Sequence, residues 1–157
     1  MLVILDVDGT LADAAHRESL RDDVNGGYFK PETVYKDEPV KAAQRVVSRL
    51  QELKYDIVVI TERDESLRDA TSRWLLENFN FAASDESLLM LPQGGFLPVA
   101  ERKRQLMQQV LAEYRARGLT SFMFIDDDVK TCEMYGAEGL ALKAPECWSV
   151  VFPENKE

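Results

Sequence analysis

The residues LVILDVDGT at positions 2–10 join a short apolar run to an acidic turn. The run Leu2–Leu5 has the length and composition of a buried strand, and Gly9 permits a tight turn after it. Asp6 and Asp8 stand two positions apart, so on an extended chain their side chains point to the same side. This stretch therefore predicts a buried strand that leads into a site made of carboxylates.

Similar apolar runs recur along the chain and alternate with patterns that are typical of helices. This alternation predicts an α/β fold with a mainly parallel sheet flanked by helices. Further strands are expected at 57–60 (ending at Thr61), 88–90, 122–125 (ending at Asp126), 140–142 and 147–151. Helices are expected to begin near Asp37, with Pro39 in the first turn, and after Asp64 or Ser66; two more are expected at about 100–117 and 129–138.

Residues 14–36 break the alternation and are expected to form a short, cap-like insert. The segment is too small for a core of its own, so we expect the whole chain, 1–157, to form one domain. The insert carries three aromatic residues, Tyr28, Phe29 and Tyr35. These rings either stack on a substrate base or pack the insert onto the body, and the sequence favours neither.

The composition excludes several classes of protein. A chain of 157 residues with 45% hydrophobic and 30% charged residues is globular, and its apolar runs are too short to span a bilayer. The net charge of −9 argues against a grip on many phosphates of a nucleic acid. One His and two cysteines, Cys132 and Cys147, do not suffice for a Cys/His zinc site. With no signal peptide recognised after Met1, we expect reduced thiols and a cytoplasmic protein.

Carboxylates follow the first and fourth of these runs, and they predict a magnesium site. Ligands of parallel sheets bind beyond the carboxyl ends of the strands, where Asp6, Asp8, Asp126 and Asp127 would converge. Carboxylates so close together require a cation, and Mg²⁺ prefers such oxygen ligands. A calcium loop is excluded, because Gly9 is the fourth residue from Asp6 and follows a strand.

The same residues suit phosphoryl transfer. A carboxylate such as Asp6 acts as a nucleophile that forms an acyl phosphate, and Asp8 would then serve as general acid and base. Thr61 at a strand end offers donors to a phosphate, and Lys103 would neutralise nucleophile and phosphate together, although a solvated lysine is an equally simple interpretation. Arg17 suits a bidentate phosphate clamp, whereas His16 is expected to be structural.

The set Asp6-Val7-Asp8-Gly9-Thr10, Thr61, Lys103 and Asp126-Asp127 resembles the four motifs of the haloacid dehalogenase (HAD) superfamily of phosphohydrolases. Within it, the chain is most similar to the phosphatase domain of phage polynucleotide kinase-phosphatases. That likeness rests on Ala15-His16-Arg17, Thr61-x-Arg63, Arg68-x-x-Thr71-x-x-Trp74-Leu75, and the ending from Glu133-Met134-Tyr135 through Gly139 to Cys147-Trp148.

The resemblance implies a Rossmann-like fold and a phosphomonoesterase that acts through an aspartyl-phosphate with Mg²⁺. It also implies that Arg17, Arg63, Gly9 and Thr10 bind the phosphate, that Thr61 and Lys103 position it, and that the substrate is a nucleic-acid 3′-phosphate end or a nucleotide. Two residues depart from the family pattern: Glu62 replaces a usual glycine, and Asp128 stands where a basic residue is common.

Other functions remain as alternatives. A small-metabolite phosphatase fits the acidic composition. A phosphoacceptor receiver domain uses similar residues, but its acidic pair comes early and its acceptor mid-chain, the reverse of the order found here. No GxxxxGK[ST] loop occurs in the chain, so no kinase domain is expected.

Overall fold

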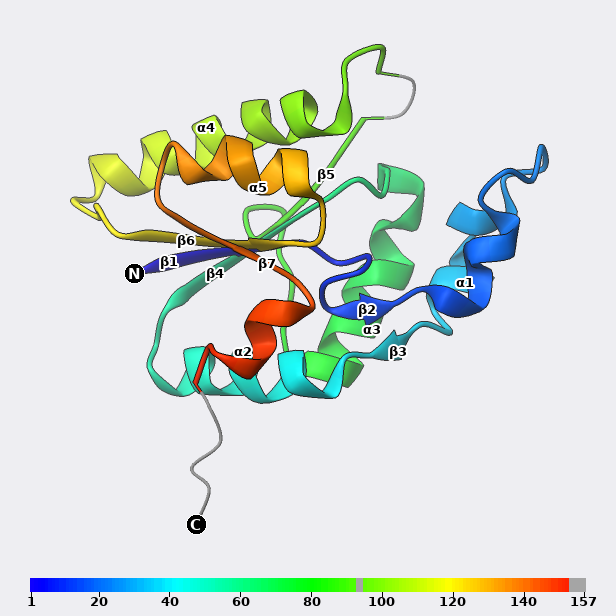
Figure 1. Ribbon diagram of the computed structural model, residues 1–157, viewed down its shortest axis with the longest axis horizontal. Helices are drawn as coiled ribbons and strands as arrows, with labels where there is room; N and C mark the ends of the chain where they lie inside the picture. The colour runs from blue at the N-terminus through cyan, green and yellow to red at the C-terminus, as the bar shows by residue number, and fades with distance from the viewer. Residues whose placement is uncertain (93–94, 153–157) are drawn as a thin grey trace.

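The computed structural model describes residues 1–92 and 95–152. Its centre is a five-stranded parallel sheet, and this confirms the predicted α/β class. Along the sheet the strands lie in the order β5 (Leu88–Met90), β4 (Asp56–Thr61), β1 (Leu2–Leu5), β6 (Phe122–Asp126) and β7 (Leu140–Lys143) (Figure 1). The first strand is therefore central, and β4 and β6 pair with it on either side.

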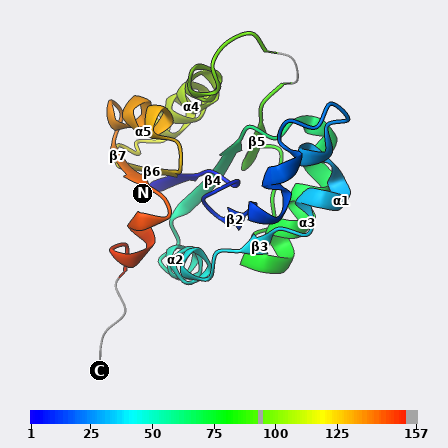
Figure 2. The ribbon, with the colours of Figure 1, turned by 45° about the vertical axis from the view of Figure 1, so that its right-hand side comes forward.

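Helices cover both faces of the sheet, as Figure 2 shows. Odd-numbered residues of β1, such as Val3 and Leu5, pack on the side of α2 (Lys41–Glu52) and α3 (Arg68–Phe79). The even-numbered residues Leu2 and Ile4 pack on the side of α4 (Val99–Ala116) and α5 (Val129–Gly136). Because both faces are buried, β1 reads as a continuous apolar run without polar alternation. Among the described helices, none combines the length and apolar character that crossing a membrane requires.

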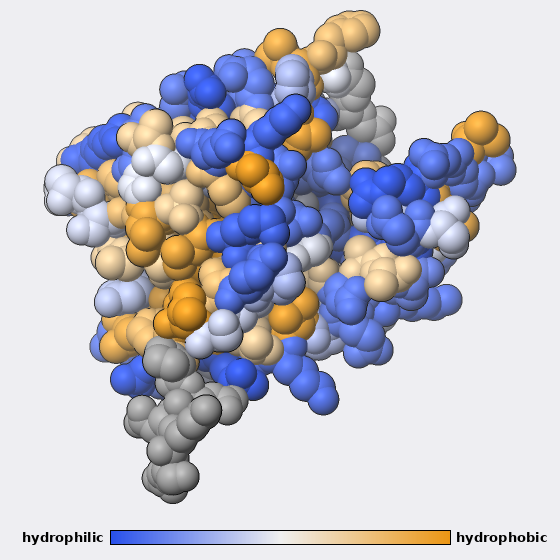
Figure 3. All heavy atoms as spheres, in the orientation of Figure 1, coloured by the Kyte–Doolittle hydropathy of each residue, from blue (hydrophilic) through white to orange (hydrophobic). Residues whose placement is uncertain are grey.

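The insert folds into short pieces beside the carboxyl edge of the sheet. β2 (Ala12–Asp13) leads into it, and it comprises the 3₁₀ turns Ala15–Leu20 and Gly27–Phe29, and α1 (Pro31–Val34). The chain then returns along β2 as β3 (Glu38–Pro39). In Figure 3 the insert, at right, projects from the rest of the molecule and is covered mainly by hydrophilic residues.

Two sequence predictions were wrong in detail. Pro39 was expected in the first turn of a helix, but it pairs with Ala12 in the β2–β3 ribbon, and α2 begins only at Lys41. The predicted strand at 147–151 is a 3₁₀ turn, Glu146–Ser149. Its Cys147 and Trp148 are buried in the core cluster on the α2 side, so these apolar residues pack against a helix instead of extending the sheet beyond β7.

Candidate active site

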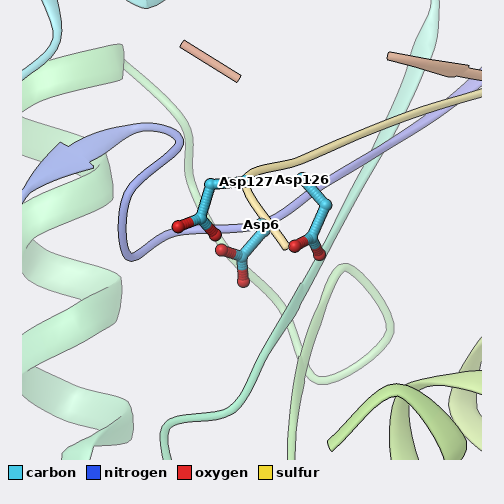
Figure 4. Close-up of side chains that lie close together, drawn as sticks. All are labelled: Asp6, Asp126 and Asp127. Atoms are coloured by element: carbon cyan, nitrogen blue, oxygen red, sulfur yellow. The ribbon is translucent and has the colours of Figure 1, made fainter. Parts of the chain in front are cut away.

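Three carboxylates meet at the carboxyl edge of the sheet. Asp6 directly follows β1, Asp126 ends β6, and Asp127 is the next residue along the chain. One oxygen atom from each lies within 4.8 Å of the other two (Figure 4). The neighbouring strands β1 and β6 end side by side, which is why residues 120 positions apart in sequence converge. The donor set fits Mg²⁺, which is bound through a few carboxylates and completes its shell with water or phosphate oxygens.

Lys103 neutralises part of this cluster. It lies on α4, is 3% exposed, and donates hydrogen bonds of 2.8 Å to Asp6 Oδ1 and 2.6 Å to Asp126 Oδ2. Burial alone would lower the pKa of Lys103, but the charges of Asp6 and Asp126 outweigh it and raise that pKa well above its usual value. The lysine is therefore a permanent cation inside the site, and not a solvated side chain.

The remaining negative charge of the cluster is costly without a metal. Burial raises the pKa of Asp6 well above its usual range, and Asp126 and Asp8 add to the increase while Lys103 opposes it. Burial and the adjacent Asp126 raise the pKa of Asp127 to about 6. A divalent cation at this point would offset both the burial and the carboxylate repulsion that raise these two pKa values.

Asp8 faces a different set of groups. Its Oδ1 accepts a hydrogen bond of 2.7 Å from Arg63 Nη2 and a second from Arg17 Nη2, and its Oδ2 accepts one of 3.0 Å from Arg63 Nε. Burial by itself would raise the pKa of Asp8, but the charges and hydrogen bonds of Arg63 and Arg17 lower it. The structure therefore joins Asp8 to two guanidinium groups, while its role as a metal ligand stays a prediction.

The two guanidinium groups are themselves held from behind by Asp37. Asp37 Oδ1 accepts from Arg17 Nε at 2.8 Å, and Oδ2 accepts from Arg17 Nη2 and Arg63 Nη2, each at 2.8 Å. His16 Nε2 lies 2.7 Å from Oδ1, and Trp74 Nε1 donates to the backbone carbonyl of Asp37 at 2.8 Å. The result is a buried layer in which two arginines alternate with two carboxylates.

Sequence reasoning missed this role of Asp37. In sequence the residue precedes Glu38-Pro39 and looks like the start of a helix. In the structure its side chain is fully buried between the insert and the end of β4. No local pattern signals such burial, because the partners come from segments 20 and 26 positions away.

The remaining residues of the predicted site lie around Asp6. Thr10 Oγ1 is 3.5 Å from Asp6 Oδ2, and Thr61, at the end of β4, is buried with its Oγ1 accepting from the Arg63 amide at 3.3 Å. Gly9 has φ +80°, and a Cβ added there would lie 2.2 Å from Asp127 Oδ2. The turn after β1 therefore requires glycine both for its backbone conformation and for the approach of Asp127.

A cavity of about 770 Å³ opens over these groups and extends to the insert. Among its described lining residues, eight carry carboxylates and three carry cations, Arg21, Lys103 and Lys130. Arg17 and Arg63, the predicted phosphate clamps, are fully buried and are not among those lining residues. Lys103, Arg21 and Lys130 are thus the cations that line the cavity, while the two buried arginines bind Asp8, which lines it.

The aromatic residues of the insert serve mainly in packing. Tyr28 is 5% exposed, with Arg17 and Arg21 over its ring at 4.3 and 4.4 Å from the centroid. Phe29 meets Tyr28 edge-on and, like Tyr35, packs against the core cluster on the α2 side. The packing interpretation therefore accounts for Phe29 and Tyr35, while Tyr28 also lines the cavity.

Asp128 belongs to the helix and not to the acidic cluster. Its Oδ2 accepts from the amide and the hydroxyl of Thr131, both at 2.8 Å, and so caps α5. An oxygen acceptor at this position satisfies amides that the first turn of a helix leaves unpaired. The family departure at Asp128 therefore has a structural explanation.

Comparison with known proteins agrees with this geometry. The family model described as the polynucleotide kinase PNKP phosphatase domain matches residues 1–150. No curated protein sequence matches the chain.

Among solved structures, the Pnkp1/Rnl/Hen1 RNA repair complex aligns with a TM-score of 0.65 and 21% identity over 90% of this chain. The class C acid phosphatase from Bacillus anthracis aligns with a TM-score of 0.57 and 16% identity, covering 99% of this chain and 73% of that one. D,D-heptose 1,7-bisphosphate phosphatase from B. bronchiseptica, complexed with magnesium and phosphate, aligns with a TM-score of 0.54 and 16% identity. The alignment covers 88% of this chain and 76% of that one. These likenesses establish a shared fold.

The chain spans 40% of the matched chain of the RNA repair complex. The family match, in contrast, covers nearly all of the sequence and includes every residue of the acidic cluster. The chain thus belongs to the HAD-type family of polynucleotide kinase PNKP phosphatase domains.

Proposed function

We propose that this chain is a Mg²⁺-dependent phosphomonoesterase that works through an aspartyl-phosphate on Asp6. The observation that carries the proposal is the double hydrogen bond of Lys103 to Asp6 and Asp126, with Asp127 beside them. A buried lysine that joins two carboxylates at the mouth of a cavity places positive charge where a phosphoryl group would meet a nucleophile.

In the first step an oxygen of Asp6 attacks phosphorus, and the bond from phosphorus to the ester oxygen breaks. The leaving alcohol takes a proton from Asp8, which must gain that proton when substrate binds, because Arg17 and Arg63 lower its pKa in the free protein. In the second step Asp8 takes a proton from water, and the resulting attack on phosphorus releases inorganic phosphate and restores Asp6. Lys103 favours the ionised form of Asp6 against the effect of burial, and it partly neutralises the transferred group.

Asp6, Asp126 and Asp127 would hold the magnesium ion, with Asp8 as the further predicted ligand. When bound, Mg²⁺ supplies electrostatic stabilisation of the phosphoryl oxygens. The chain's own contribution is to bury Asp6 and Asp126 and to fix their orientation through Lys103 and the backbone of Asp128, whose amide donates to Asp126 Oδ1 at 3.0 Å.

We propose a nucleic-acid 3′-phosphate end or a nucleotide as substrate, with family membership as support. A small phosphorylated metabolite is the second candidate, and the excess of carboxylates in the cavity favours it. Eight acids against three cations provide little attraction for a chain of phosphates, although one metal and Lys103 suffice for a single phosphate.

A substrate panel tests the function. The protein is assayed with Mg²⁺ on an aryl phosphate, a 3′-phosphorylated oligonucleotide, 3′- and 5′-mononucleotides and sugar phosphates, and again after chelation and dialysis. In parallel, acid quenching with a ³²P-labelled substrate traps the phosphoenzyme. We expect Mg²⁺-dependent release of phosphate and label on Asp6; full activity without metal, or no label on wild type during turnover, contradicts the mechanism.

A further inference from the structure

Glu62 is a carboxylate of the cavity that the mechanism leaves without a role. It follows Thr61 at the end of β4 and lines the same cavity as Asp6, Asp8 and Lys103. The residue is partly buried, and the described part of the chain gives its side chain neither a hydrogen bond nor an ion pair. Glu62 thus contrasts with Asp6, Asp8 and Asp126, each of which is held by Lys or Arg.

The charges that act on Glu62 include those of the predicted catalytic groups. Burial raises the pKa of Glu62, Lys103 lowers it, and Asp8 raises it further. Arg21 of the insert and Arg102 of α4 also act on it. Glu62 therefore shares one cavity with the catalytic edge of the sheet and with Arg21 of the insert.

A carboxylate at this point opposes the binding of a phosphate. The residue after Thr61 stands at the strand end where the phosphate is expected, and like charges at close range repel. Among the described residues, no hydrogen bond or ion pair holds the Glu62 side chain in place. A partly desolvated acceptor with no partner in the protein is suited to a hydrogen-bond donor on the substrate.

We propose that Glu62 accepts a hydrogen bond from a hydroxyl group on the carbon next to the phosphoester, and so selects ribonucleoside 3′-phosphates over their 2′-deoxy counterparts. This inference rests on the proposed function and narrows its substrate class. In a ribonucleoside 3′-phosphate, the 2′-hydroxyl is attached to the carbon beside the ester and enters the cavity together with the phosphate. In the deoxy compound that donor is missing, and the partly buried Glu62 gains no partner from the substrate.

The size of the expected preference follows from the chemistry of the bond. A hydrogen bond to a charged group favours the matched substrate by about 10- to 100-fold in kcat/KM. A site that expects a hydroxyl rejects the analogue without it, because its own polar group is left unpaired. The preference should therefore arise as a penalty on the deoxy substrate as much as a gain on the ribo substrate.

The test compares kcat/KM for a ribonucleoside 3′-phosphate and the 2′-deoxyribonucleoside 3′-phosphate with the same base. Wild type is measured beside Glu62→Ala, Glu62→Gln and the matched control Glu18→Gln, which removes one charge from another carboxylate of the same cavity. We expect a ribo-to-deoxy ratio of about tenfold or more in wild type and in Glu18→Gln. The ratio should fall to within about twofold in Glu62→Ala and to an intermediate value in Glu62→Gln, which keeps an acceptor but no charge.

Three results overturn the inference: a wild-type ratio near one, a ratio that Glu62→Ala and Glu62→Gln leave unchanged, or an equal fall in Glu18→Gln. Thermal melting of each variant identifies loss of folding, and Glu62→Gln, which keeps shape and volume, decides the matter if Glu62→Ala does not fold. An aryl phosphate measured in parallel separates the two proposals. Its Mg²⁺-dependent hydrolysis by wild type upholds the proposed function even where the ribo preference is absent.

Discussion

The guanidinium group of Arg17 binds the carboxylate of Asp37 through two hydrogen bonds of 2.8 Å, with both side chains fully buried. Nη2 of Arg17 donates both to Asp37 Oδ2 and to Asp8 Oδ1, so the arginine links the position of Asp37 to that of the predicted general acid. Arg63 makes the same connection from β4. The insert and the sheet are thus joined through charges that balance one another.

Replacement of Asp37 by Asn should unbalance this layer. Two buried arginines would then face one carboxylate, and we expect a loss of about 3–5 kcal/mol in the free energy of unfolding. In protein that remains folded, kcat should fall more than KM rises, because Asp8 loses its fixed orientation. Urea unfolding and steady-state kinetics measure the two effects.

His16→Ala is the matched control for Asp37→Asn. It removes a partner of the same Asp37 oxygen, but its side chain is 38% exposed, so its effect should be below about 1 kcal/mol. Equal losses in the two variants would show that the arginines do not depend on Asp37.

Replacement of Asp6 by Asn should abolish turnover while the fold survives. An amide cannot form the acyl phosphate, whereas Lys103 keeps Asp126 as a partner in the variant. Phosphate release measures the loss of turnover, and thermal melting measures whether the fold survives. Asp22→Asn, at an exposed residue of the insert, is the control. Residual activity within about tenfold of wild type would refute the role of Asp6. Such a decrease is a loss of only about 1.4 kcal/mol of transition-state stabilisation.

Replacement of Asp8 by Asn should slow turnover strongly and leave substrate binding nearly intact. An aryl phosphate needs little protonation of its leaving group, so its phosphorylation step should suffer less than that of an alkyl phosphate. Rapid-quench measurement of that step for both substrates provides the comparison. If the two losses are equal, Asp8 does not protonate the leaving group.

The metal-free protein should become less stable as the pH rises. The pKa of Asp127 is raised to about 6 in the folded state, so the protonated carboxyl stabilises the folded protein. This stabilisation is fully present below about pH 4 and is lost as the pH rises through about 6. For a partly exposed carboxylate we expect about 1 kcal/mol between these limits. Unfolding free energies from pH 4 to 7 with chelator should show this fall in wild type but not in Asp127→Asn, and Mg²⁺ should reverse it. A flat difference between the two proteins would contradict the repulsion within the cluster.

Substrate length should matter little. Arg21, Lys103 and Lys130 are the described cations of the cavity, and they can meet only the terminal one or two nucleotides. We expect kcat/KM to change less than about threefold between oligonucleotides of about two and ten residues, with a shallow dependence on salt, since few counterions are released. A steep salt dependence together with a large gain in rate on lengthening would reveal an extended nucleic-acid surface.

Much of the framework could be predicted from sequence because it depends on local patterns. Apolar runs followed by acids or threonine marked β1, β4 and β6 within one residue of their observed ends. In a parallel sheet such ends must share an edge, so Asp6, Thr61 and Asp126 were expected together, and the structure brings them together. The burial of Lys103 was not decided by sequence, because its neighbours Arg102 and Arg104 carry the same charge.

The choice of partners was decided only by tertiary structure. Arg17 and Arg63 both bind Asp8 and Asp37 in the structure, because a buried guanidinium group requires acceptors for its donors, and their contact with a phosphate stays a prediction. Pro39 pairs with Ala12 in a ribbon, and Cys147 packs in the core cluster on the α2 side, through contacts with segments that are distant in sequence. Sequence specifies where strands end and which chemical groups stand there. Which of those groups face the cavity, and which neutralise one another behind it, depends on contacts between distant segments that exist only once the sheet and the insert have assembled.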